Sequence, residues 1–146
     1  KPDFQTYIKN VLANAKMLAE TLKNNGFKIY SGGTDTHLML VDLRPFNVKG
    51  NLASESLCRA NITCNKNGIP FDTEKPMITS GIRLGSQAAT TRGFGLKEFE
   101  KVGNLITKVI KGLSENPEDN SKIEGEVRDE VVNLCSNFPI YKNLNK

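Results

Sequence analysis

Two long amphipathic helices, one at the start of the chain and one in its last third, limit the folds that this sequence can adopt. Apolar residues recur at three- and four-residue spacing over residues 3–25 and again over residues 96–113, which is the period of a helix with one buried face. The inward positions predicted for the first helix are Phe4, Tyr7, Ile8, Val11, Leu12, Ala15, Leu18, Ala19 and Leu22. Both helices need apolar surface to pack against, and the residues between them must supply it.

Short apolar runs, separated by glycine and proline, fill the interval between these helices. They predict strands at residues 27–30, 37–43, 62–64 and 77–84. The run at 37–43 is so continuously apolar that we expect it to be buried on both faces. The polar stretch at residues 65–76, which contains glycine and two prolines, is predicted to be a loop.

Three more helices complete the predicted architecture. Short helices are expected at residues 51–60 and 86–91, and a longer one at residues 122–137. The inward residues of the 51–60 helix are predicted to be Leu52, Leu57 and Cys58. Ser121 and Glu124 have the spacing of a capping box at the start of the last helix. Without the short helix at residues 86–91, the order is α-β-β-α-β-β-α-α, which predicts an α+β fold, a two-layer α/β sandwich formed by one domain over residues 1–146.

Composition argues against two classes of partner. The chain of 146 residues is 38% hydrophobic, and it has no apolar run of the roughly 18–20 residues that a membrane-spanning helix needs. Its net charge of +4 comes from dispersed side chains, without the basic stripe and interleaved aromatic residues of a nucleic-acid-binding surface. We therefore expect neither a membrane nor a nucleic acid as a partner.

The three cysteines and the single histidine do not predict a metal site. Cys58, Cys64 and Cys135 lack CxxC spacing, and His37 is the only histidine of the chain. Each cysteine has apolar neighbours, so we expect small buried thiols. Unpaired thiols are typical of a reducing compartment, which favours a cytoplasmic protein. His37 adjoins an apolar strand and is interpreted as a structural histidine.

One arginine interrupts an otherwise apolar strand pattern. Residues 78–85 read Ile-Thr-Ser-Gly-Ile-Arg-Leu-Gly, with Arg83 at the exit of the predicted strand. A guanidinium is always charged and is costly to bury unpaired, so an arginine in such a pattern usually has a dedicated anionic partner. The planar fork of arginine suits the carboxylate of a ligand, which it binds in a bidentate way. An ion pair with a nearby aspartate or glutamate is the alternative.

The strand with Arg83 is one of a series of sequence blocks that together resemble a single enzyme family. The series includes Gly-Gly-Thr-Asp at 32–35, His-Leu at 37–38, Leu-Val-Asp-Leu at 40–43, Ala-Asn-Ile-Thr at 60–63, Asn-Lys-Asn at 65–67, Thr-Ser-Gly-Ile-Arg-Leu-Gly at 79–85, Thr-Arg-Gly-Phe at 91–94 and Phe-Pro-Ile-Tyr at 138–141. In this order, the blocks resemble the C-terminal domain of serine hydroxymethyltransferase, also called glycine hydroxymethyltransferase.

This resemblance implies the small C-terminal domain of a fold-type I pyridoxal-phosphate-dependent transferase. Enzymes of the family interconvert serine plus tetrahydrofolate with glycine plus 5,10-methylenetetrahydrofolate in one-carbon metabolism, as homodimers or tetramers. The family's lysine for pyridoxal 5'-phosphate, and the aspartate and histidine that hold the cofactor ring, lie upstream in motifs that this chain lacks. The resemblance therefore implies a piece of a longer enzyme, inactive when isolated, with no catalytic or cofactor-binding residue of its own.

Two residues of this chain match the family's ligand contacts. By resemblance, Arg83 binds the α-carboxylate of serine or glycine, and Asn67 contacts the folate ring. An asparagine amide offers donors and an acceptor, as the edge of a pterin does. The alternative for Asn67 is a turn asparagine that bonds to its own backbone.

Other positions in the matching blocks have weaker interpretations. Arg92 matches the family's second arginine and is interpreted as structural or interface-facing, and Lys66 is expected to be exposed. Ser86 and Gln87 stand where the family has Thr-Pro. We expect Ser86 to keep a hydroxyl cap, and Gln87 to loosen the first helical position behind Arg83.

A different function class fits part of the same pattern. A stand-alone α+β module that senses a ligand or binds a protein would also lack a catalytic lysine and a nucleophile–base pair. The ordered blocks along nearly the whole chain favour the enzyme fragment.

Overall fold

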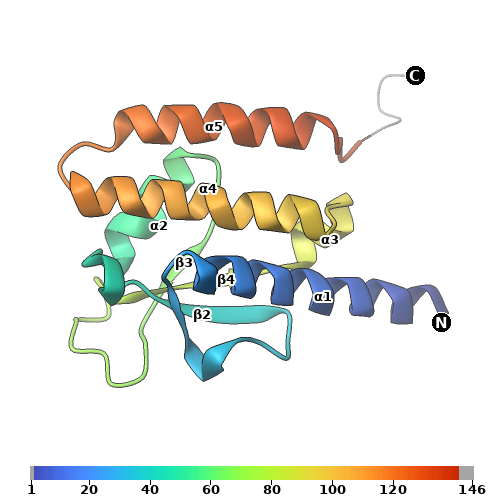
Figure 1. Ribbon diagram of the computed structural model, residues 1–146, viewed down its shortest axis with the longest axis horizontal. Helices are drawn as coiled ribbons and strands as arrows, with labels where there is room; N and C mark the ends of the chain where they lie inside the picture. The colour runs from blue at the N-terminus through green and yellow to red at the C-terminus, as the bar shows by residue number, and fades with distance from the viewer. Residues whose placement is uncertain (1, 142–146) are drawn as a thin grey trace.

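Helices and a sheet form two layers in the computed structural model, which describes residues 2–141 (Figure 1). The helices are α1 (Pro2–Asn24), α2 (Gly50–Arg59), α3 (Gln87–Arg92), α4 (Leu96–Glu115) and α5 (Ser121–Ser136), with two 3-10 turns, η1 (Tyr30–Gly32) and η2 (Arg44–Phe46). The strands are β1 (Lys28–Ile29), β2 (Leu38–Asp42), β3 (Asn65–Asn67) and β4 (Gly81–Gly85). The predicted α+β class is confirmed. No helix within the described range is long and apolar enough to cross a membrane.

The sheet is antiparallel throughout, in the strand order β1-β2-β4-β3. β4 is an inner strand, because it pairs with β2 on one side and with β3 on the other. Arg83 lies opposite Leu40 in the first pair and opposite Asn65 in the second. Directly opposite residues of an antiparallel pair share a face, so these three side chains form a row across the sheet.

The core lies between this sheet and the helices. Alternate residues of the two longest strands are buried: Met39 and Val41 of β2, and Ile82 and Leu84 of β4. α1 contacts β1 and β2, and α2 contacts β3 and β4, while α4 packs on both of these helices. α1 and α4 run side by side in Figure 1. Their buried residues include Leu18, Leu22, Phe99, Leu105, Ile106, Val109 and Ile110.

The first turns of α1 project beyond the core (Figure 1). Phe4 and Ile8, which the periodicity predicts to face inward, are both exposed, Phe4 to 61%. Burial begins at Val11. The prediction is wrong at the two earlier positions because no element among residues 2–141 lies opposite them.

One face of β2 stays uncovered, although its apolar sequence predicts burial on both. Met39 and Val41 face the helices, whereas Leu38 is exposed and Leu40 is half-buried. The helices lie on one side of the sheet (Figure 1). The prediction of a strand covered on both faces is therefore wrong for the part of the chain that the structure describes, and the row that contains Arg83 belongs to the open face.

A strand forms where the sequence predicts a loop. Residues 62–64 were the expected strand, but the pairing with β4 starts at Asn65 and ends at Asn67. These polar side chains are compatible with an edge strand, which needs no apolar face to be stable. Apolar periodicity cannot detect a strand of this kind.

The strand predicted at residues 77–84 begins only at Gly81. The backbone N–H groups of Ile78 and Thr79 both donate to the carbonyl of Lys75 and so close a turn. Thr79 has a φ of 62° there, in the left-handed region. The apolar residues before Gly81 therefore belong to the preceding loop.

The capping box predicted for α5 does not form. The carboxylate of Glu124 accepts hydrogen bonds from Ser56 Oγ (2.6 Å) and from Arg59 Nε and Nη2 (both 2.7 Å). The Ser121 N–H instead donates to the carboxylate of Asp119 (3.0 Å). Glu124 is thus held by residues of α2, far away in the sequence, and is not free to cap its own helix.

The buried face of α2 also differs from the predicted one. Leu57 is buried, but Leu52 and Cys58 are exposed. Small residues complete the buried stripe, which consists of positions 53, 56, 57 and 60. This is the regular i, i+3, i+4, i+7 spacing, hidden from hydrophobicity alone because three of its members are alanine or serine.

Candidate functional site

Arg83 lies on the open face of the sheet, in the middle of β4. The backbone around it is fixed by strand pairing on both sides. Its neighbours Ile82 and Leu84 are buried in the core, so the alternation of the strand directs Arg83 away from the helices.

The guanidinium of Arg83 is exposed, and no residue in the range 2–141 forms a hydrogen bond or an ion pair with it. By contrast, Arg44, Arg59 and Arg92 all bond to protein acceptors. The internal ion pair that the sequence left open is therefore not formed in this part of the chain. A free guanidinium on a fixed strand can bind a carboxylate without first breaking a protein contact.

Asn67 ends β3 beside this arginine. It lies opposite Gly81, and Arg83 lies opposite Asn65, so Arg83 and Asn67 are diagonal neighbours on one face, with Cα atoms roughly 7–8 Å apart. Asn67 Nδ2 donates to the carbonyl of Gly68 (2.8 Å), as the turn interpretation predicts. Its Oδ1 accepts no hydrogen bond from the described residues, and the turn leaves this acceptor available to a ligand.

Asp72, which the sequence did not single out, organises the loop after Asn67. Its carboxylate accepts hydrogen bonds from the backbone N–H groups of Ile69, Glu74 and Ser80, and from the hydroxyl of Ser80. Burial raises the pKa of Asp72, but these bonds outweigh it and hold the pKa well below its usual range. The only sequence signal is an aspartate in a Gly/Pro-rich loop, which is too common to mark a site.

Ser86 fixes the exit of β4 behind Arg83. Its hydroxyl donates to the carbonyl of Val11 in α1 (2.7 Å), and its backbone N–H donates to the carbonyl of His37 (3.0 Å). The predicted hydroxyl cap of α3 is therefore absent, because the hydroxyl bonds across to α1. The strand exit stays anchored to two other elements in spite of Gln87. The side chain of His37 itself is half-buried.

Arg92 lies away from this face and has a structural role. Its Nε donates to the carbonyl of Phe138 (2.7 Å), and its Nη2 to the carbonyl of Cys135 (3.2 Å). Cys135 lies in the last turn of α5 and Phe138 follows the helix, so the guanidinium lies at a helix C-terminus, where a positive charge is favourable. The structural interpretation of Arg92 agrees with this geometry.

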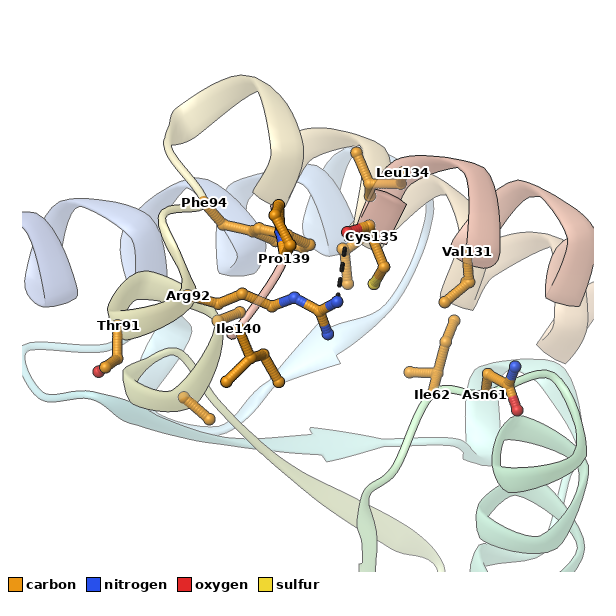
Figure 2. A pocket seen from close by; sticks show the side chains of 13 residues that line it. Asn61, Ile62, Thr91, Arg92, Phe94, Val131, Leu134, Cys135, Pro139 and Ile140 are labelled. Carbon is orange, nitrogen blue, oxygen red and sulfur yellow. Dashed lines mark hydrogen bonds between the residues drawn. The ribbon is translucent and has the colours of Figure 1, made fainter. Parts of the chain in front are cut away.

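The groove around Arg92 is large and mainly apolar. Figure 2 shows it between α3, the end of α5 and the residues around Ile62, with a volume of about 730 Å³. Neither Arg83 nor Asn67 lines it. A smaller cavity of about 350 Å³ adjoins Arg83 and is lined by Asn65, Cys64 and apolar core residues. Asn67 lines neither cavity. Because Arg83 and Asn67 both carry free polar groups on the open face of the sheet, we place the candidate site on that face.

The thiol that lines the cavity next to Arg83, that of Cys64, is not a reactive group. Burial raises the pKa of the Cys64 thiol to about 11, so Cys64 stays protonated at neutral pH. Cys58 is exposed, Cys64 and Cys135 are half-buried, and all three are free. The expectation of a buried thiol is wrong for Cys58. No group of three His, Cys, Asp or Glu side chains among the described residues could hold a metal ion.

The described residues do not by themselves fit pyridoxal phosphate. A lysine that condenses with an aldehyde works best when desolvated, because burial lowers its pKa and frees the amine. No lysine in the range 2–141 is buried. Lys66, beside Asn67, is half-buried and not exposed as expected, and it too lacks an apolar enclosure.

Comparison with known proteins agrees with the sequence blocks. A family model described as "Serine hydroxymethyltransferase" matches residues 1–106. The chain is 86% identical over 144 residues to the serine hydroxymethyltransferase of Pelagibacter ubique, which covers 99% of this chain and 33% of that protein. It is 63% identical over 142 residues to the serine hydroxymethyltransferase of a Marinomonas species, and this match covers 97% of this chain and 33% of that protein.

A third relative is covered to the same extent. The serine hydroxymethyltransferase of Paramagnetospirillum magneticum is 61% identical over 142 residues, with 97% of this chain and 33% of that protein covered. The chain thus spans about a third of the length of the curated relatives that it matches. It belongs to the serine hydroxymethyltransferase family.

Proposed function

We propose that this chain works as part of a serine hydroxymethyltransferase. The enzyme would interconvert serine plus tetrahydrofolate with glycine plus 5,10-methylenetetrahydrofolate, with pyridoxal 5'-phosphate as cofactor. The observation that carries the proposal, within a chain of this family, is the unpaired guanidinium of Arg83 next to Asn67 on an open sheet face.

In this proposal Arg83 holds the α-carboxylate of serine or glycine. Its five donors in a planar fork give two parallel hydrogen bonds to a carboxylate. Two bonds fix the orientation of the amino acid, whereas a single bond would let it rotate. The paired strand beneath Arg83 keeps the guanidinium in place before the substrate arrives.

Asn67 takes the folate in the same proposal. Its amide plane is set by the bond from Nδ2 to the carbonyl of Gly68, which leaves Oδ1 to accept from a pterin N–H. Its diagonal position relative to Arg83 puts two ligands side by side without a shared protein contact.

The proposal includes partners beyond the two substrates. The enzyme would assemble as a homodimer or tetramer and would be cytoplasmic, which the three free cysteines favour. Catalytic and cofactor-binding residues would come from other parts of the full-length protein, since no lysine described here is suitable for the cofactor.

The isolated chain is expected not to bind pyridoxal phosphate at one specific lysine. The lysines between residues 2 and 141 are all at least partly exposed, so borohydride should trap low and scattered labelling. Peptide mass spectrometry measures the labelled positions, with the full-length protein as the positive control. Stoichiometric labelling of a single lysine in the 146-residue chain would contradict this expectation.

Replacement of Asn67 by alanine in the full-length protein is expected to separate two activities and so to test the function. The folate-dependent conversion of serine should weaken by about 1–3 kcal/mol in transition-state stabilisation, because one amide edge is lost. Folate-independent cleavage of a 3-hydroxy amino acid should persist, because it requires only the carboxylate contact and the cofactor. Steady-state kinetics with each substrate provide the comparison.

The matched control is Asn104→Ala. Asn104 is an amide on α4 that bonds to Asn25, away from the open face. It should leave both activities unchanged. If Asn67→Ala lowers both activities together, Asn67 only shapes its turn, and a full-length protein without folate-dependent activity would refute the proposed function.

A further inference from the structure

We propose that Asp72 is a positioning residue that holds Asn67 against β4. This inference rests on the proposed function and adds the group that sets the geometry of the folate contact. Asp72 lies in the loop that connects β3 to β4, and it touches neither Arg83 nor Asn67 by a hydrogen bond within the described range.

The Asp72 carboxylate joins the two ends of this loop. Its Oδ2 accepts from the N–H of Ile69 (3.2 Å) and from the N–H of Ser80 (2.9 Å). Its Oδ1 accepts from the N–H of Glu74 (3.0 Å) and from Ser80 Oγ (2.7 Å). Ile69 closely follows Asn67, and Ser80 directly precedes β4, so one side chain ties the segment behind Asn67 to the strand that carries Arg83.

The positions of β3 and β4 depend to different degrees on the hydrogen bonds that Asp72 accepts. β4 pairs with strands on both sides, and its position does not depend on the loop. β3 is an edge strand of three residues that pairs only with β4. Strand pairing ends at Asn67 and Gly81, and beyond that point Asp72 is the acceptor that the two loop ends share. Loss of Asp72 should therefore displace Asn67 and leave Arg83 in place.

The backbone of the loop shows that it is held in shape. Phe71 has a φ of 57° and Thr79 a φ of 62°, and non-glycine residues adopt this region only when their surroundings impose it. The side chain of Phe71 is 98% exposed, so packing does not compensate. For Phe71, the hydrogen bonds that the neighbouring Asp72 accepts are the contacts that can compensate.

The other end of the loop is anchored independently. The N–H groups of Gly50 and Asn51, at the start of α2, donate to the carbonyls of Thr79 and Ile78. A Cβ at Gly50 would lie within 2.0 Å of Thr79 Oγ1, so the helix approaches the loop as closely as only glycine permits. These contacts keep the approach to β4 fixed, whereas none of them reaches the segment behind Asn67.

A double-mutant cycle in the full-length protein tests the inference. Asp72→Asn leaves one acceptor oxygen where the carboxylate offers two, and should raise the KM for tetrahydrofolate about tenfold. Folate-independent cleavage of a 3-hydroxy amino acid should change less than about twofold. If Asp72 acts through Asn67, the Asp72→Asn/Asn67→Ala protein should have the folate KM of Asn67→Ala alone.

The matched control is Asp119→Asn. Asp119 also accepts a backbone N–H, that of Ser121, but at the start of α5. It should leave the folate KM unchanged. If Asp72→Asn does not fold, Ser80→Ala tests the inference in its place, because it removes only the hydrogen bond from the Ser80 hydroxyl to Asp72. This substitution should raise the KM for tetrahydrofolate by about two- to threefold.

Specific outcomes overturn the inference. Additive effects of Asp72→Asn and Asn67→Ala on the folate KM would show that the aspartate does not act through Asn67. Equal losses of the folate-dependent and folate-independent activities would show a general structural role. A wild-type protein without folate-dependent activity would instead refute the proposed function, which keeps the two failures distinct.

Discussion

Replacement of Arg83 by lysine in the full-length protein is expected to raise the KM for serine strongly and to lower kcat/KM at least about 100-fold. The guanidinium is free, exposed and mounted on a strand that is paired on both sides. A charge-assisted bidentate contact with a carboxylate contributes about 3 kcal/mol, and lysine restores the charge without the planar fork. Steady-state kinetics with serine as the varied substrate measure the loss.

Arg92→Lys is the informative control, since Arg92 belongs to the same sequence block. Its guanidinium donates to the carbonyls of Phe138 and Cys135 at the end of α5. Its replacement should lower stability and leave the KM for serine unchanged. An unchanged KM in Arg83→Lys would mean that Arg83 does not bind the substrate carboxylate.

The fold class could be predicted from the sequence because most of it depends on helix periodicity. The first predicted helix, residues 3–25, differs from α1 by one residue at each end, and α4 extends the prediction of residues 96–113 by two residues. Errors occurred where the partner of a side chain is distant in the sequence. Glu124 has the spacing of a local cap, yet its carboxylate is bound by Arg59 and Ser56 of α2.

The candidate site was predictable to a smaller extent. Arg83 was identified from residue type and pattern, and its free guanidinium agrees with a ligand role, which remains a prediction. Asn67 was identified by resemblance alone, since β3 is polar and has no periodic signal. Asp72 was missed because four hydrogen bonds to one loop carboxylate depend on the folded geometry of residues 69–80.

Replacement of Glu124 by alanine is expected to lower the free energy of unfolding of the chain by about 2–3 kcal/mol. Glu124 is 5% exposed, and its carboxylate joins α5 to Ser56 and Arg59 of α2 by three short hydrogen bonds. Arg59 can turn to solvent when its partner is lost, so the cost is smaller than for a fully buried pair. Urea unfolding followed by circular dichroism measures the difference.

The effect of Glu124→Ala should depend on pH in one direction. Hydrogen bonds from Arg59 lower the pKa of Glu124 in the folded chain, in spite of its burial. A carboxyl group whose pKa is lower in the folded than in the unfolded chain stabilises the fold at pH values above its unfolded-state pKa, which is about 4.3. This stabilisation is lost as the pH falls through the folded-state pKa. The stability difference between the two proteins should therefore be full at pH 7 and shrink below pH 4.

Glu126→Ala is the matched control on the same helix. Glu126 pairs with Lys108 at the surface, with both side chains well exposed, and such pairs contribute at most about 1 kcal/mol. Its replacement should change stability little, and added salt should reduce even that effect. If Glu124→Ala and Glu126→Ala cost the same, or if the Glu124→Ala difference persists unchanged at low pH, the ion pair between α2 and α5 does not stabilise the fold, and apolar packing alone holds these helices together.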